Sequence, residues 1–470
     1  MSCTKSKDFN DCELNILRNS VDNIQEKIGR ETLSNPNIKK IIEIVEDFLR
    51  KKKSICYGGT AINNILPEQD QFYDRSVEIP DYDFFSKNAL NDAKELADIY
   101  YKEGFQEVEA KAGIHGGTFK VFVNFIPVAD ITYLVPEIFN NLKRDAIKIN
   151  GILYCPPNYL RMSMFLELSR PRGDVSRWEK VLKRLTLLNK HYPLLDGKCK
   201  NIEIQRMFEG DSKTNKKDLF NITKKILIDN GVILFGALAH QLLKQYNKNK
   251  NIDPIPDFDV LSTKPKQTAE IIKERLLDYD FKNVKITKKP GIGEVIAPHY
   301  EVIVGKNTVV FIYEPLACHS YNQFMENDRI IKVASIDTML SFYLAFLYSN
   351  RPYYDDERIL CMASFLFDVQ QKNRLKQVGL LKRFGIKCYG NQSTIETIRS
   401  EKTEKYKELK NKRNTAEYEK YFLRYRPDEK KKTQKHKKRT SKKSAKKDKP
   451  KKKNQKKSTM KNKRKKSNKK

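Results

Sequence analysis

The sequence predicts an α/β (α+β) protein built from two tandem units of similar order, the second of them degenerate. Residues 79–86 read Ile-Pro-Asp-Tyr-Asp-Phe-Phe-Ser and residues 255–262 read Ile-Pro-Asp-Phe-Asp-Val-Leu-Ser, so one acid-bearing segment occurs twice. Each copy follows a glycine-containing turn by about 20 residues. The length, 470 residues, also exceeds what a single hydrophobic core usually supports. We therefore expect two folded units with extensions.

The first unit is expected to follow two helices within residues 10–50, where apolar residues recur at helical spacing. A short strand at 54–57, a tight turn at Gly58-Gly59-Thr60 and a helix come next. The elements expected after that are an acidic strand at 81–83, a helix at 89–101, one strand at 120–133 and helices at 159–168 and 178–188. A second Gly-Gly-Thr, at 116–118, lies between two strand patterns, so we interpret it as a hairpin turn.

The second unit repeats that order less faithfully. Its expected elements are a strand at 232–235, a turn at 236–238, a helix at 239–246, an acidic strand at 257–261 and an apolar strand at 308–317. Ala237 and Leu238 stand in its turn, and aligning residues 127–130 with 315–318 places Cys318 where the first unit has Asp130. We expect a structural pseudo-domain, although Asp257 and Asp259 leave weak metal binding open.

The predicted division of the chain has five parts: N-terminal helices at 1–50, the first unit at 51–195, the degenerate unit at 196–390, a helical extension at 391–429 and a disordered Lys-rich tail at 430–470. The tail holds 24 of the 92 lysines and arginines and one acid, so the remainder keeps a net charge of +10 out of +33. Nucleic acid fits both parts, because lysine clusters release counterions from a phosphate backbone. A solubility or localisation signal is the alternative for the tail.

Eight scattered cysteines, with no Cys-x-x-Cys pair, suggest reduced thiols in an intracellular compartment. The N-terminus has no apolar segment typical of a signal peptide. The longest apolar stretch, near 339–348, is too short to span a bilayer. We therefore expect a soluble protein with no membrane partner.

The chemistry is expected at Asp81, Asp83 and Asp130 together with the first glycine turn. Side chains alternate along a strand, so residues 81 and 83 project from one face about 7 Å apart, a spacing that suits hard divalent cations. The glycines of the turn let the backbone approach a phosphate at a helix N-terminus.

This combination resembles the nucleotidyltransferase fold of the DNA polymerase beta superfamily. The resemblance implies that Asp81, Asp83 and Asp130 are the catalytic acids and hold two Mg²⁺ or Mn²⁺ ions, with ATP as substrate. It also implies that Gly58, Gly59 and Thr60 bind the nucleotide. The gap between turn and acids is longer than is usual in the superfamily, so residues 67–79 are interpreted as an inserted loop.

The arrangement is similar, more closely, to poly(A) polymerase catalytic subunits of poxviruses and giant DNA viruses. Residues 57–63 (Tyr-Gly-Gly-Thr-Ala-Ile-Asn), the Ile-Pro-Asp-Tyr-Asp strand and the two-unit order carry this resemblance, over about residues 40–390. It implies template-independent addition of AMP from ATP to mRNA 3′ ends. It also implies a protein of the host cytoplasm that can be packaged in the virion, and it leaves open a homodimer or a processivity subunit.

Two other functions stay open at this point. One is a nucleotidyltransferase acting on another acceptor, such as tRNA or a small molecule, but the basic tail and the second unit favour a polymer. The other is a non-catalytic RNA-binding scaffold, which the intact set of three acids argues against.

Overall fold

The computed structural model describes residues 9–194, 199, 216–246 and 257–429. Residues Met1–Tyr425 form one compact unit, and within the second unit, Arg426–Lys470, only residues 426–429 are described. The expected Lys-rich tail and the first two residues of the second acidic motif, Ile255 and Pro256, lie outside the described residues.

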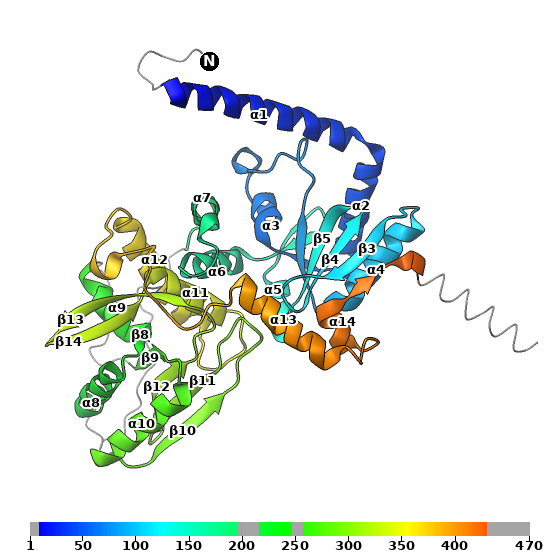
Figure 1. Ribbon diagram of the computed structural model, residues 1–470. Helices are drawn as coiled ribbons and strands as arrows, with labels where there is room; N and C mark the ends of the chain where they lie inside the picture. Colours follow the sequence, from blue (N-terminus) through cyan, green and yellow to red (C-terminus); the bar gives the residue numbers. More distant parts are fainter. Residues whose placement is uncertain (1–8, 195–198, 200–215, 247–256, 430–470) are drawn as a thin grey trace, which may run out of the picture. The chain divides into compact units, whose positions relative to one another are not determined.

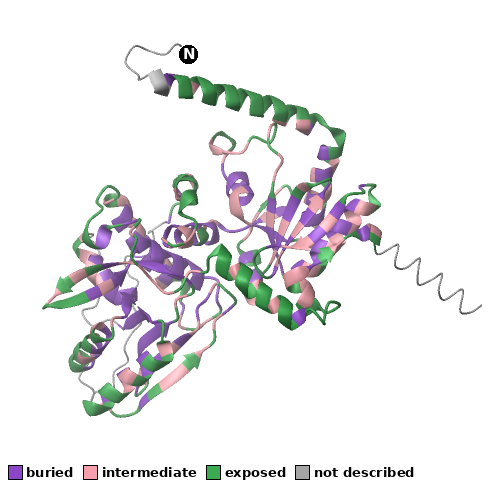
Figure 2. Cartoon of the chain, viewed as in Figure 1, coloured by how far each residue is buried: buried purple, intermediate pink, exposed green. Residues whose placement is uncertain are grey.

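The two expected N-terminal helices are present as α1 (Phe9–Ser34) and α2 (Pro36–Lys52) (Figure 1). Asn35 separates them, because its side chain caps α2 by accepting the N–H of Asn37, and Pro36 fits the first helical position. The apolar face of α2 is buried in the core. In contrast, α1 is exposed along most of its length (Figure 2).

The first sheet has eight strands in the order β16-β3-β4-β5-β2-β1-β7-β6. Their bounds are β1 (Ile55–Cys56), β2 (Tyr82–Ser86), β3 (Val108–Ala112), β4 (Thr118–Val123), β5 (Ile126–Tyr133), β6 (Ile147–Ile149), β7 (Ile152–Tyr154) and β16 (Arg424–Tyr425). Strand β2 runs parallel to β5 and antiparallel to β1, which runs parallel to β7. The helices of this half are α3 (Gly58–Ile65), α4 (Ala89–Lys102), α5 (Pro136–Arg144), α6 (Pro157–Leu168) and α7 (Trp178–His191).

The second sheet repeats this topology, in the order β10-β11-β12-β9-β8-β14-β13-β15. Its strands are β8 (Ile233–Phe235), β9 (Phe258–Leu261), β10 (Val284–Lys289), β11 (His299–Val304), β12 (Asn307–Tyr313), β13 (His319–Glu326), β14 (Arg329–Ala334) and β15 (Cys388–Tyr389). The central directions match, since β9 runs parallel to β12 and antiparallel to β8, which runs parallel to β14. The chain therefore contains one α/β unit twice, as the repeated acidic segment suggested.

The helices around the second sheet take the same places in the repeat. They are α8 (Lys216–Asp229), α9 (Gly236–Leu243), α10 (Pro265–Asp278), α11 (Ile336–Phe346) and α12 (Asp356–Lys372). Helix α11 packs against its counterpart α6, and all its residues are buried. The last helices, α13 (Ile395–Leu409) and α14 (Ala416–Phe422), lead to β16, which pairs with β3 of the first sheet.

Within the described residues, three short 3₁₀ helices lie in connecting segments and a fourth continues α9. They are η1 (Glu68–Asp70), η2 (Val175–Arg177), η3 (Lys244–Tyr246), which follows α9, and η4 (Gly379–Leu381). Among the described residues, no helix has the length and apolar character needed to cross a bilayer.

One expectation about local structure was wrong. The single strand expected at 120–133 is the hairpin β4–β5, because Asn124 and Phe125 adopt left-handed backbone angles with φ of 50° and 67° and reverse the chain. The apolar run continues through the turn, so hydrophobic pattern alone did not reveal it.

The cysteines were also misinterpreted. Cys199 pairs with Cys361 and Cys318 with Cys388, with Cα–Cα distances of 5.4 and 5.1 Å. The partners are 162 and 70 residues apart, so the fold brings them together and no local spacing reveals the pairs. Cys56 and Cys155 are the free cysteines of the described residues, and both are buried.

Candidate active site

The glycine turn forms the first turn of α3 and lies directly against the acidic strand. Gly58 has a φ of 73°, and a Cβ built on it would stand 2.7 Å from Oδ2 of Asp83. Both the backbone angle and the space therefore require glycine. The backbone N–H of Tyr57 donates to the backbone oxygen of Asp83, at 2.9 Å, and the Thr60 hydroxyl donates to that of Asp81, at 2.6 Å.

Neighbouring parallel strands bring the three predicted acids together. Asp83 of β2 is paired in register with Asp130 of β5, so their side chains leave the same face of the sheet as neighbours. Asp81 precedes β2 by one residue and, two positions from Asp83, projects to that face as well. The intervening Tyr82 points the other way and is fully buried, as is Phe84.

The cavity beside this strand measures about 160 Å³. Gly59, Thr60, Asp81 and Asp83 all line it. The structure thus joins the glycine turn and the acidic pair in one place.

The electrostatics of the site are those of crowded carboxylates. Burial raises the pKa of Asp83 to about 7, and the charges of Asp81 and Asp130 contribute to that rise. Burial, followed by the charge of Asp130, also raises the pKa of Asp81. Lys120 of β4 forms an ion pair with Asp130 and compensates part of this negative charge.

These residues suit a divalent cation by their chemistry. Carboxylate oxygens are the ligands that Mg²⁺ and Mn²⁺ prefer, and three acids with one lysine leave negative charge to be neutralised. Within the described residues, no three His, Cys, Asp or Glu side chains are already arranged around a common metal position. Lys120 engages one of the three carboxylates, that of Asp130, in a salt bridge.

Sequence comparison finds that the first unit is similar to viral proteins named as poly(A) polymerase subunits. Residues 43–174 match the family model described as poly(A) polymerase catalytic subunit. The first unit is similar to that family. A protein of African swine fever virus (strain Badajoz 1971 Vero-adapted), named as a candidate poly(A) polymerase catalytic subunit, is 38% identical over 177 residues, covering 36% of this chain and 37% of that protein. A protein of Acanthamoeba polyphaga mimivirus with the same name is 33% identical over 162 residues, covering 34% of this chain and 27% of that protein.

The fold comparison extends over most of the chain, whereas the sequence matches span about a third of the length of these curated relatives. The crystal structure of the Megavirus polyadenylate synthase superposes with a TM-score of 0.73 at 20% sequence identity. The alignment covers 91% of this chain and 88% of that one. The chain therefore has the fold of that polyadenylate synthase, including both sheets.

Arg184 is a site residue that the sequence did not reveal. It lies on α7, and its guanidinium nitrogen Nη1 stands 3.0 Å from where a Cβ of Gly59 would be. The guanidinium also donates to the hydroxyl of Tyr73 and lies 4.8 Å from the ring centre of Phe72. It therefore places a positive charge at the start of α3, where the polymerase family resemblance puts the nucleotide.

The inserted loop is held beside the turn by Asn63. Its side-chain oxygen accepts the backbone N–H groups of Phe72 and Tyr73, each at 2.8 Å. Tyr73, Arg75 and Glu78 line the cavity with the acids. The hydrogen bond between Arg184 and Tyr73 of this loop joins residues that are 111 positions apart in the sequence. No local sequence pattern predicts such a contact.

Arg161, on α6, has a structural role. It is buried and donates to Asn158, Asn189 and the backbone oxygen of Tyr192. These bonds tie α6 to the end of α7.

The second unit lacks the third acid, but the missing position differs from the one expected. Asp259 of β9 is paired in register with Phe311 of β12, so Phe311 and not Cys318 corresponds to Asp130. Cys318 follows β12 and is bonded to Cys388. Gly236 repeats the turn, with a φ of 73° and a Cβ position even closer to Asp259. The second unit thus keeps the geometry of the turn while its third ligand position is apolar.

Proposed function

We propose that the chain is a polynucleotide adenylyltransferase that adds AMP from ATP to RNA 3′ ends without a template. The observation that carries the proposal is the contact of Gly58 with Asp83 together with the register of Asp83 and Asp130. A helix N-terminus, which can bind phosphate, therefore lies beside three acids on one face of a sheet. The similarity of residues 43–174 to poly(A) polymerase catalytic subunits supports the choice of reaction.

The residues have distinct roles in this proposal. Asp81, Asp83 and Asp130 would hold Mg²⁺ or Mn²⁺, which when bound neutralises the triphosphate and favours ionisation of the attacking 3′-hydroxyl. The backbone N–H groups at Gly59 and Thr60 bind phosphate oxygens. Arg184 adds a guanidinium for the same phosphates, and guanidinium groups pair well with phosphate geometry.

RNA is the acceptor that best fits the charge of the chain. Residues 1–429 carry a net charge of +10, and residues 430–470 add 24 lysines and arginines. These positive charges provide contacts to a phosphate backbone. These contacts position an RNA without reading its sequence. The proposed setting is the cytoplasm of an infected host cell and the virion.

A second copy of the chain is the partner that we propose for α1. Its apolar residues Leu14, Leu17, Val21, Ile24 and Ile28 follow the alternating spacing of three and four residues that forms a coiled-coil seam. All five are exposed, and Leu17 and Ile24 each keep 58% of their surface accessible. Such a seam is complementary to itself, so two copies of α1 can bury it together. A separate processivity subunit is the alternative occupant.

The test of the reaction uses purified full-length protein, labelled RNA with a free 3′-hydroxyl and each nucleoside triphosphate in turn, with Mg²⁺ or Mn²⁺. We expect extension with ATP well above that with CTP, GTP or UTP, and none in EDTA. Addition to tRNA or to a small molecule but not to unstructured RNA would favour the other acceptor class. No addition to any acceptor would contradict the proposal.

A further inference from the structure

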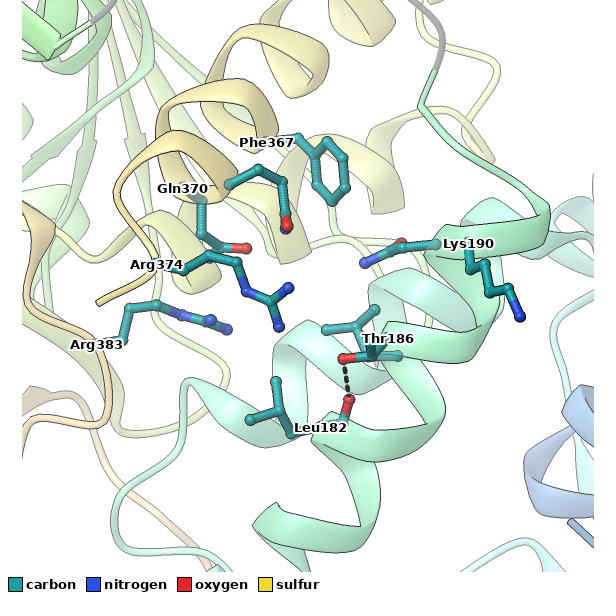
Figure 3. A pocket seen from close by; sticks show the side chains of 10 residues that line it. Leu182, Thr186, Lys190, Phe367, Gln370, Arg374 and Arg383 are labelled. Carbon is teal, nitrogen blue, oxygen red and sulfur yellow. Dashed lines mark hydrogen bonds between the residues drawn. The ribbon is translucent and has the colours of Figure 1, made fainter. Parts of the chain in front are cut away.

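A second cavity, of about 330 Å³, lies between α7 and the chain at the end of α12 (Figure 3). It shares no lining residue with the cavity beside the acids. Its lining contains three cationic and three amide side chains and no acid. This volume lies at the lower end of the range of small-ligand sites, roughly 300–1,000 Å³.

The inner wall of the cavity is rigid and already paired. The buried Arg383 donates through Nε and Nη2 to the carboxylate of Asp337, at 2.9 and 2.7 Å. Gln370 donates to the same carboxylate at 3.1 Å. The Arg383–Asp337 pair is therefore satisfied and fixes the wall in place, while no described residue pairs with Nη1 of Arg383.

The mouth of the cavity carries an uncompensated charge. Lys190 is neutralised by Asp70, at 2.8 Å, and Arg383 by Asp337. Arg374 is exposed, and the part of the chain that the structure describes offers it no acid within ion-pair distance. Figure 3 shows the guanidinium of Arg374 extending from the end of α12 toward Leu182 and Thr186 of α7. A site with one free guanidinium and no acid favours an anionic ligand.

The rest of the lining suits a heterocyclic base. Phe367, Leu182 and Leu185 supply apolar surface, and an aromatic ring can stack on any base. Gln371 and Asn189 supply amide groups, which hydrogen-bond the edges of unpaired bases. Asn189 accepts a bond from Arg161 through Oδ1, so the nitrogen of its amide is not engaged by that bond and can donate to a ligand.

We propose that this cavity binds one nucleotide unit, with the phosphate on Arg374 and the base against Phe367 and the amides. The inference rests on the proposed function, which supplies two sources for this nucleotide. It is either a nucleotide of the RNA substrate upstream of the 3′ end or a free nucleotide. Arg184 faces the glycine turn and Thr186, two residues later, lines the cavity. Because two residues cover about 200° of a helix, the two sites lie on opposite sides of α7, which is roughly 10 Å across. An RNA with its 3′ end at the acids is thus within reach of the cavity.

The experiment compares Arg374→Glu with Lys376→Glu in the full-length protein. Lys376 is exposed, lies two residues away and does not line the cavity, so the two variants change net charge equally. Binding is measured by fluorescence anisotropy with labelled oligoadenylate of about 15 nucleotides, the upper range for single-strand sites. Binding of AMP and ATP is measured by calorimetry. If circular dichroism shows that Arg374→Glu is misfolded, Arg374→Gln replaces it in the same measurements.

We expect Arg374→Glu to weaken the binding of at least one of these ligands about tenfold or more, as loss of a charge-assisted phosphate contact implies. Lys376→Glu should change the affinity for that ligand less than about threefold, as a general surface charge does. An effect on RNA alone assigns the cavity to the RNA chain, and an effect on AMP or ATP assigns it to a free nucleotide. Equal effects of the two variants, or no effect of either on any probe, would overturn the inference.

The same variants separate this inference from the proposed function. Arg374 does not line the cavity beside the acids, so the binding measurements test the second cavity independently of adenylate addition. If the unmodified protein added no adenylate to any acceptor while ligand binding still depended on Arg374, the proposed function would fail and the cavity would remain a nucleotide site. Normal polymerisation, with binding of every probe unchanged by Arg374→Glu, would support the proposed function and contradict the nucleotide site.

Discussion

Asp83 and Asp259 each lie against a glycine with a left-handed backbone at the start of a helix. On the neighbouring parallel strand, Asp83 is paired with Asp130, whereas Asp259 is paired with Phe311. The two units therefore share the turn and the second acid and differ at the third. A carboxylate in that position adds a hard oxygen ligand, whereas a phenylalanine cannot bind a cation through oxygen. We therefore propose one active centre, in the first unit.

Asp83→Asn should abolish adenylate addition, with a loss of at least about 100-fold in kcat, because metal-ion stabilisation contributes several kcal/mol. The metal-free protein should at the same time become more stable near pH 7.5. Burial and neighbouring charges raise the folded-state pKa of Asp83 to about 7, so its ionised form costs folding free energy above the unfolded pKa.

Thermal melting in EDTA between pH 5 and 8 checks the second part. The unmodified protein should lose stability as the pH rises toward 7, and the Asn variant should lose less. A variant that polymerises normally at matched circular dichroism would remove Asp83 from the site.

Asp257→Asn combined with Asp259→Asn should leave the rate of one-nucleotide addition within about twofold of the unmodified enzyme. Phe311 in the third position makes that set of ligands incomplete. The matched comparison is Asp81→Asn with Asp83→Asn, the same change in the first unit. Similar losses in both double variants would mean that the second unit takes part in catalysis.

The sequence predicted the duplication, and it placed the glycine turn near the acidic pair, because both depend on local patterns. The succession of a strand, a glycine turn and a helix start can be recognised in a window of about ten residues. Two acids on the same face of a strand can be recognised in a window of three. The correspondence of Asp130 with Phe311 depends on strand register, and a motif alignment placed Cys318 there instead. Arg184 and the disulfides depend on contacts between distant segments, for which one sequence carries no signal.

Removing residues 430–470 should weaken RNA binding at low salt and flatten the dependence of log K on log salt. The segment holds 24 lysines and arginines, which release counterions from RNA phosphates when they bind. Addition of one nucleotide at saturating RNA should be spared. Binding isotherms at several salt concentrations check this, and identical slopes for intact and truncated protein would assign the tail to localisation or packaging.

Leu17→Glu with Ile24→Glu should convert a dimer into a monomer, because both charges would enter the seam of α1. The control is Asn19→Glu with Asn23→Glu, which adds the same charge at exposed polar positions of that helix. Sedimentation velocity of the three proteins gives their masses. A monomeric unmodified protein would favour a separate processivity subunit as the occupant of α1.

Gly58→Ala should damage the active site far more than a change at another left-handed glycine. Gly104 has a φ of 101° and no atom within 4 Å of an added Cβ, so Gly104→Ala should cost only the backbone term, about 1–2 kcal/mol of unfolding free energy. Gly58 carries a similar backbone term, and its Cβ would also meet the carboxylate of Asp83 at 2.7 Å. Either Asp83 or the start of α3 must then move.

The experiment compares the activities of Gly58→Ala and Gly104→Ala under conditions in which both variants are folded. Urea unfolding gives the free energy of unfolding, and single-nucleotide addition at a temperature where both variants are fully folded gives the rate. We expect Gly104→Ala to retain the rate of the unmodified protein and Gly58→Ala to lose at least about tenfold, since small displacements of reacting groups are costly. Equal rates would show that adenylate transfer does not depend on the close approach of the glycine turn to Asp83.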